Sequence, residues 1–114
     1  MKYVRLYTGE DQKSYFEEVD CKTTVKQELG NYSEKYPATA IQFRDTLPSA
    51  TFDWHNAPEP QYIVYLQGEV EVIASGGETR IFKAGDVLLA TDTTGKGHIS
   101  KTLSIGKAII IKTK

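Results

Sequence analysis

The two histidines of this chain are its best candidates for chemistry, because an imidazole can transfer protons near neutral pH or bind a metal ion. His55 follows Trp54, and His98 follows a glycine-rich turn. Both stand beside a predicted strand, a position typical of residues around a barrel opening. A lone histidine is more often a hydrogen-bonded structural residue. The surrounding sequence must therefore decide between the two interpretations.

Other reactive patterns are absent from the sequence. Cys21 is the only cysteine, so one chain can form neither an internal disulfide nor a thiolate cluster for zinc. The run Gly95-Lys96-Gly97 lacks the spacing and the hydroxyl residue of a phosphate-binding loop. No Gly-x-Ser-x-Gly elbow of a serine hydrolase occurs.

The charge balance argues against polyanionic partners. Fourteen basic residues against fifteen acidic ones give a formal net charge of −1. We therefore expect no nucleic-acid partner and no membrane partner, but a small-molecule ligand. The longest apolar run, Ala108 to Ile111, is too short to cross a bilayer, and the first residues do not resemble a secretory signal. A cytoplasmic location is the expectation.

Short β-branched and aromatic runs separated by turn residues predict an all-β domain. The predicted strands are Tyr3 to Thr8, Tyr15 to Val19, Thr39 to Arg44, Tyr62 to Leu66, Glu69 to Ala74, Arg80 to Phe82, Val87 to Thr91 and Lys107 to Lys112. Alternation in the fifth of these predicts that Val70 and Val72 face the core. Ser75-Gly76-Gly77 predicts a tight hairpin. A closed sandwich or barrel accommodates these strands best.

The segment from Trp54 to Gly68, followed by Gly85 to Leu89, resembles the two sequence motifs of the cupin superfamily. In that family the first motif reads His-x-His, three or four residues, Glu, six residues and Gly. The second motif begins with Gly and ends in His. The residues that match or approximate these positions are His55, Gln61, Gly68, Gly85 and His98.

The stretch 92–98, Asp-Thr-Thr-Gly-Lys-Gly-His, is similar to the second motif of small single-domain bacterial cupins. The resemblance covers about residues 40–112. It implies a double-stranded β-helix, the cupin jelly-roll barrel, as a single domain over residues 1–114. The strands within residues 1–38 are then an N-terminal extension of that barrel.

Cupins often hold a divalent metal ion on three histidines and a glutamate. Carried over to this chain, the implied ligands are His55, Gln61 and His98. Ala57 stands where the second histidine is expected, and Gln61 replaces the glutamate. Such a set is weaker than three strong ligands, and it does not distinguish Zn, Fe, Ni and Mn. In the alternative, Gln61 is an inward amide that neighbouring groups satisfy. Either way, the period of two turns Tyr65 inward as well.

Three functions remain open on these residues. The first is a small cupin enzyme of the isomerase, lyase, cyclase or dioxygenase kind. In it, His55 and His98 are the catalytic residues, or hold the metal, and Gln61 and Tyr65 bind the substrate. The second is a ligand-binding or dimerisation module that has lost the metal site. The third is an interaction protein without a pocket, suggested by seven tyrosines.

We also predict a homodimer. The N-terminal strands are additional to the barrel motifs, so they need a sheet edge with which to pair.

Overall fold

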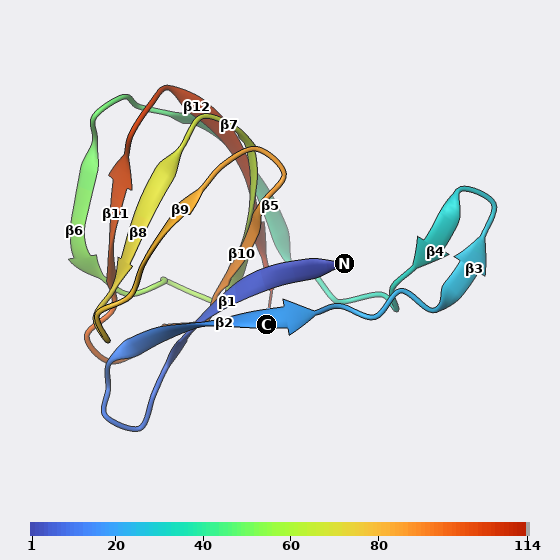
Figure 1. Ribbon diagram of the computed structural model, residues 1–114, viewed down its shortest axis with the longest axis horizontal. Helices are drawn as coiled ribbons and strands as arrows, with labels where there is room; N and C mark the ends of the chain where they lie inside the picture. Colours follow the sequence, from blue (N-terminus) through green and yellow to red (C-terminus); the bar gives the residue numbers. More distant parts are fainter. Residues whose placement is uncertain (114) are drawn as a thin grey trace.

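Two sheets packed face to face form the body of the protein, and a short hairpin projects from it (Figure 1). The computed structural model describes residues 1–113. Its strands are β1 (Lys2–Thr8), β2 (Ser14–Asp20), β3 (Val25–Gln27), β4 (Gly30–Tyr32), β5 (Ala40–Thr46), β6 (Thr51–His55), β7 (Gln61–Gln67), β8 (Val70–Ala74), β9 (Thr79–Phe82), β10 (Val87–Ala90), β11 (His98–Thr102) and β12 (Gly106–Lys112). Among these residues no helix is long and apolar enough to span a membrane.

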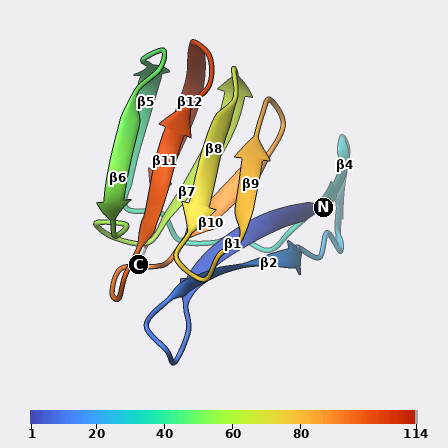
Figure 2. The same ribbon diagram turned by 60° about the vertical axis from the view of Figure 1, so that its left-hand side comes forward.

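The strand order explains how distant residues meet. One sheet has the order β2-β1-β10-β7-β12-β5, the other has β6-β11-β8-β9, and β3 pairs with β4 alone. Figure 2 shows the second sheet in front of the first. The all-β prediction is confirmed, and each of the eight predicted strands overlaps a strand of the structure. The sequence analysis did not predict β3, β4, β6 and β11.

The core lies between the facing sheets and follows from strand alternation. Val70 and Val72 are 6% and 1% exposed, as the alternating carboxylates and valines of β8 predict. The Ser75-Gly76-Gly77 turn joins β8 to its antiparallel neighbour β9, as predicted. Leu6 and Leu88 are completely or almost completely buried where β1 and β10 pair.

The N-terminal strands complete the larger sheet of their own chain. β1 runs parallel to β10, with Val4 opposite Leu88 and Leu6 opposite Ala90. β2 then pairs with β1 along its whole length. These strands therefore find their edge without a second copy, and the reasoning that led to the homodimer prediction does not apply. The homodimer itself needs a different basis.

Truncating Leu6 tests whether the N-terminal hairpin is integral to the fold. Leu6→Ala should lower the free energy of unfolding in urea by about 2–5 kcal/mol, because it leaves a cavity in the core. Ile105→Ala should change it by no more than about 0.5 kcal/mol, because that side chain is 66% exposed. Equal losses in the two variants would contradict this assignment.

Candidate functional site

A cavity of about 660 Å³ lies between the inner faces of the two sheets. Its wall contains all four residues that the sequence singled out, namely His55, Gln61, Tyr65 and His98. They come from three strands, and the pairing of β6 with β11 places His55 directly opposite His98. The structure thus brings together residues that lie far apart in sequence.

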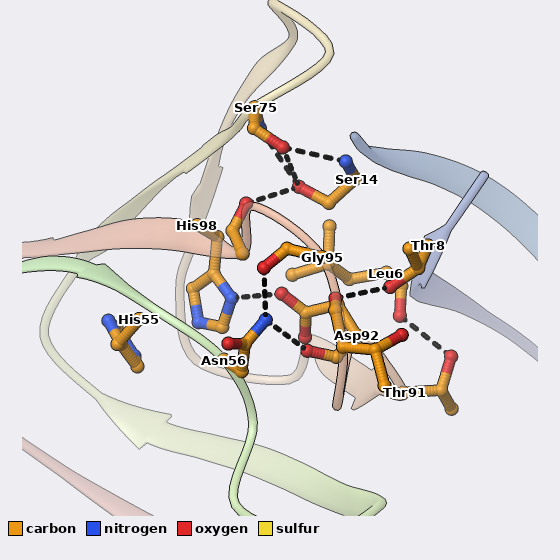
Figure 3. A network of polar contacts seen from close by, with 12 residues as sticks. Leu6, Thr8, Ser14, His55, Asn56, Ser75, Thr91, Asp92, Gly95 and His98 are labelled. Atoms are coloured by element: carbon orange, nitrogen blue, oxygen red, sulfur yellow. Dashed lines mark hydrogen bonds and ion pairs between the residues drawn. The ribbon is translucent and has the colours of Figure 1, made fainter. Parts of the chain in front are cut away.

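A buried carboxylate orients His98. Asp92 Oδ2 lies 2.5 Å from His98 Nδ1, and the two residues are 0% and 6% exposed. A carboxylate accepts hydrogen bonds, so the imidazole donates from Nδ1 and keeps a lone pair on Nε2. Nε2 has no partner within residues 1–113, yet it is not sealed from solvent. Figure 3 shows the His98 ring between Asp92 and His55.

Only one oxygen of this carboxylate is satisfied. Asp92 Oδ1 is buried and has no hydrogen-bond partner in the described part of the chain. Within residues 1–113, the His98 imidazole is therefore the one group that forms a hydrogen bond with this carboxylate. The single hydrogen bond to Asp92 therefore fixes the orientation of the His98 ring.

Backbone contacts hold the loop that carries Asp92. The Asn56 side chain donates from Nδ2 to the carbonyl oxygens of Asp92 and Gly95, at 3.2 and 3.1 Å. The Ala57 amide donates to the same Asp92 carbonyl at 3.2 Å. Asn56 and Ala57 follow His55 directly, so one segment positions both histidines (Figure 3).

A glycine permits the close approach of this loop to β6. Gly97 has a φ of +71°, and a Cβ atom there would lie 2.1 Å from the carbonyl oxygen of His55. Ser14, at the start of β2, donates from Oγ to the Gly97 carbonyl at 2.7 Å. The N-terminal hairpin therefore supports the loop from its other side.

His55 has a different environment. Its ring stacks on Phe52, with centroids 3.5 Å apart, and lies 4.3 Å from the His98 ring. Its Nδ1 is 2.8 Å from the Asp53 carbonyl oxygen, which can only accept, so Nε2 again keeps the lone pair. Burial lowers the pKa of His55 below its ordinary value, and the nearby His98 adds to this effect. His55 is therefore a neutral base at neutral pH.

Tyr65 and Gln61 both line the cavity, but they differ in whether their polar group has a hydrogen-bond partner within residues 1–113. Tyr65 stacks on Phe82, and burial raises the pKa of its phenol, so it stays protonated. Its hydroxyl makes no hydrogen bond to residues 1–113 and can donate to a ligand. Gln61 Oε1 instead accepts from Lys112 Nζ at 2.5 Å. This contact agrees with the alternative in which Gln61 is an inward amide that neighbouring groups satisfy.

The expected metal ligands do not form a set that suits a divalent ion. The Gln61 oxygen is occupied by an ammonium group, whose positive charge opposes a second cation. Within residues 1–113 there is no group of three or more His, Cys, Asp or Glu side chains that could hold a metal. As they are placed here, His55, Gln61 and His98 therefore fit a divalent metal ion poorly.

Asp92 is the one residue of this hydrogen-bonded site that the sequence analysis did not single out as a candidate beside the two histidines, Gln61 and Tyr65. The available signal was an acidic residue six positions before a histidine, within one glycine-containing loop. Spacing alone does not show that the loop folds back, so the pairing emerges only in three dimensions.

No family model and no curated protein sequence matches this chain. Its resemblance to cupins therefore rests on the motif residues themselves.

The pKa of His55 can be tested by NMR titration. We expect a value below 6.5 in the wild type, and a shift back toward 6.5 in Phe52→Ala, because the exposed ring regains hydration. Protonation of His55 should accordingly oppose the folded state only as the pH falls below about 6.5. Ile81→Ala, on β9, should leave this pKa unchanged. A wild-type value above 6.5 would contradict the assignment.

Gly97 and Gly77 provide a matched test of the loop. Both have a positive φ, but a Cβ at Gly77 would meet nothing within 4 Å. Gly77→Ala should cost only the strain of the backbone, about 1–3 kcal/mol of unfolding free energy. Gly97→Ala should cost more and should also shift the NMR signals of His98, because it clashes with His55. Equal losses would show that the close approach is unimportant.

Proposed function

We propose that this chain is a small cupin-type barrel that binds a small polar metabolite between its sheets and transfers a proton to or from it. The cupin part of the proposal is supported by the motif residues and by two facing sheets with an internal cavity. The catalytic part is supported above all by one observation, the buried contact between Asp92 and His98 at the cavity wall.

His98 acts as the general acid or base in this proposal. Asp92 keeps the proton on Nδ1, so Nε2 is free to accept a proton from a bound molecule and to return it elsewhere. His55 provides a second neutral imidazole close to the first. Proton transfer of this kind is the chemistry of isomerases and lyases that act on activated C–H bonds.

The cavity also contains groups that select the ligand. Arg44 and Lys112 bring positive charge to its wall, and the Lys112 side chain is only 13% exposed. Glu59 lies 3.8 Å from the Lys112 ammonium but is half exposed, so it offsets that charge only in part. Together with the Tyr65 hydroxyl, these groups favour a metabolite with a carboxylate or another anionic group.

A non-catalytic ligand-binding module is the second candidate. It is favoured by the contact between Gln61 and Lys112, which replaces a family ligand by an internal hydrogen bond. In this case the cavity binds a ligand, and His98 contributes only a hydrogen bond. The cavity volume makes the third candidate, an interaction protein without a pocket, the least suitable.

Deuterium exchange distinguishes the candidates. Small hydroxy acids, keto acids and acidic sugars are first screened for an increase in the melting temperature of the protein. Each stabilising compound is then incubated with the protein in D₂O, and loss of its C–H signals is followed by ¹H NMR. Wild type should catalyse exchange, and His98→Asn should slow it by about 10²–10⁴-fold, because the base is lost.

Asparagine is the appropriate replacement, since its amide N–H can still donate to Asp92. Alanine would leave a buried carboxylate without its partner, which costs about 3–5 kcal/mol of stability. Asp92→Asn should also slow exchange and shift its pH profile. Binding without exchange, equal in wild type and His98→Asn, would support the binding module. Exchange that EDTA abolishes and Zn²⁺ or Mn²⁺ restores would support a metal-assisted enzyme.

A further inference from the structure

The outer face of the six-stranded sheet is apolar over its central strands. Side chains that alternate with the cavity-lining residues point away from the core here, and strand pairing arranges them in two rows. The first row is Phe43, Ile109, Val64 and Val87, and the second is Ile41, Ile111, Tyr62 and Leu89. We call these eight residues the outer face.

Such a face is unusual on a sheet that borders water. A sheet with one solvated side normally alternates apolar and polar residues, whereas continuous apolar strands indicate burial on both sides. Phe43 and Ile41 are 78% and 56% exposed. Asp45 lies opposite Lys107 at one end of the face, and Arg5 binds Glu17 at 2.8 Å beyond the other. An apolar centre with a polar rim is typical of a protein interface.

A projecting arm lies on the same side of the molecule. Residues 21–38 form this arm, and its strands β3 and β4 pair only with each other. It extends from the side of the six-stranded sheet that is opposite the four-stranded sheet (Figure 1). At its base, Cys21 Sγ and the Tyr36 hydroxyl are 3.8 Å apart.

The arm also exposes apolar side chains to solvent. Leu29 at its tip is 92% exposed, and Val25 and Tyr32 on its strands are 40% and 41% exposed. A two-stranded hairpin is marginally stable at best when isolated in water. An arm of this kind is stabilised when its apolar side chains pack on another surface.

We propose that two copies of this chain pack outer face against outer face about a twofold axis, with each arm closing over the partner. Every chain has one outer face and one arm, so a twofold pairing covers both surfaces of both copies at once. No such surface then remains to which a third copy could bind. A standard interface involves about 20–30 residues on each side. The outer face and the 18-residue arm together provide a number of this order.

Two isoleucines permit a matched test. Ile41 on the outer face and Ile81 on β9 both occupy strands, and they are 56% and 51% exposed. Sedimentation velocity across the micromolar range should give the wild type twice the chain mass of 12.8 kDa. Ile41→Glu should raise the dissociation constant of the dimer by at least about 30-fold, because it places a charge within the apolar surface that the partner covers. Ile81→Glu should leave it unchanged.

The arm has a separate test. Leu29→Glu should weaken the dimer by roughly 10-fold, because it removes an apolar contact at the rim of the interface. Circular dichroism checks that each variant is folded, and Phe43→Glu replaces Ile41→Glu if the latter is not. A wild type with the mass of one chain at all concentrations would overturn the proposal, as would a mass above two chains. Equal effects of Ile41→Glu and Ile81→Glu would do the same. An unchanged dimer in Leu29→Glu would overturn the role of the arm.

Discussion

The buried contact between Asp92 and His98 constrains where the loop of residues 92–98 can lie, and with it the segments that contact this loop. A carboxylate with no exposed surface is costly unless it has a partner, and its nearest one is the His98 imidazole at 2.5 Å. The carboxylate must therefore be held where that ring can reach it. This requirement explains why the loop of residues 92–98 makes so many backbone contacts, although loops usually tolerate variation.

Support for the loop comes from two segments that lie far from it in the sequence. Thr8 Oγ1 donates to the Thr94 carbonyl at 2.9 Å, and the Lys96 amide donates to the Gln12 carbonyl at 2.8 Å. From the opposite side, Asn56 bonds the carbonyl oxygens of Asp92 and Gly95. The N-terminal hairpin thus has two roles. It extends the larger sheet through β1, and it holds the loop that orients His98.

The sequence predicted the fold and the cavity residues better than the chemistry that joins them. Period-two alternation defines which side of a strand faces inward, so Val72 could be placed from local pattern alone. Tyr65 was placed from the inward Gln61 that the cupin resemblance implies. Strand β6 was missed although Thr51 to His55 alternates polar and aromatic residues, because Pro48 and Pro58 mark the stretch around it as rich in turns. Strand β11 was missed because glycines precede it. Asp92 was not singled out because its contact with His98 depends on how the loop folds back. The internal pairing of β1 with β10 depends on a parallel contact across most of the chain, which no local signal reports.

The outer face and the cavity share the same strands, and this links assembly to the site. On β5, Ile41 points outward, whereas its neighbour Gln42 and Arg44 line the cavity. On β12, Ile111 points outward beside Lys112, whose ammonium bonds Gln61 in the cavity. β5 is an edge strand, so within one chain only β12 holds it by backbone hydrogen bonds. Packing a second copy on the outer face would hold this edge by side-chain contacts, on the strand that also carries Arg44. In the proposed dimer, the surface that joins two copies therefore also supports the part of the cavity wall that is proposed to select the ligand.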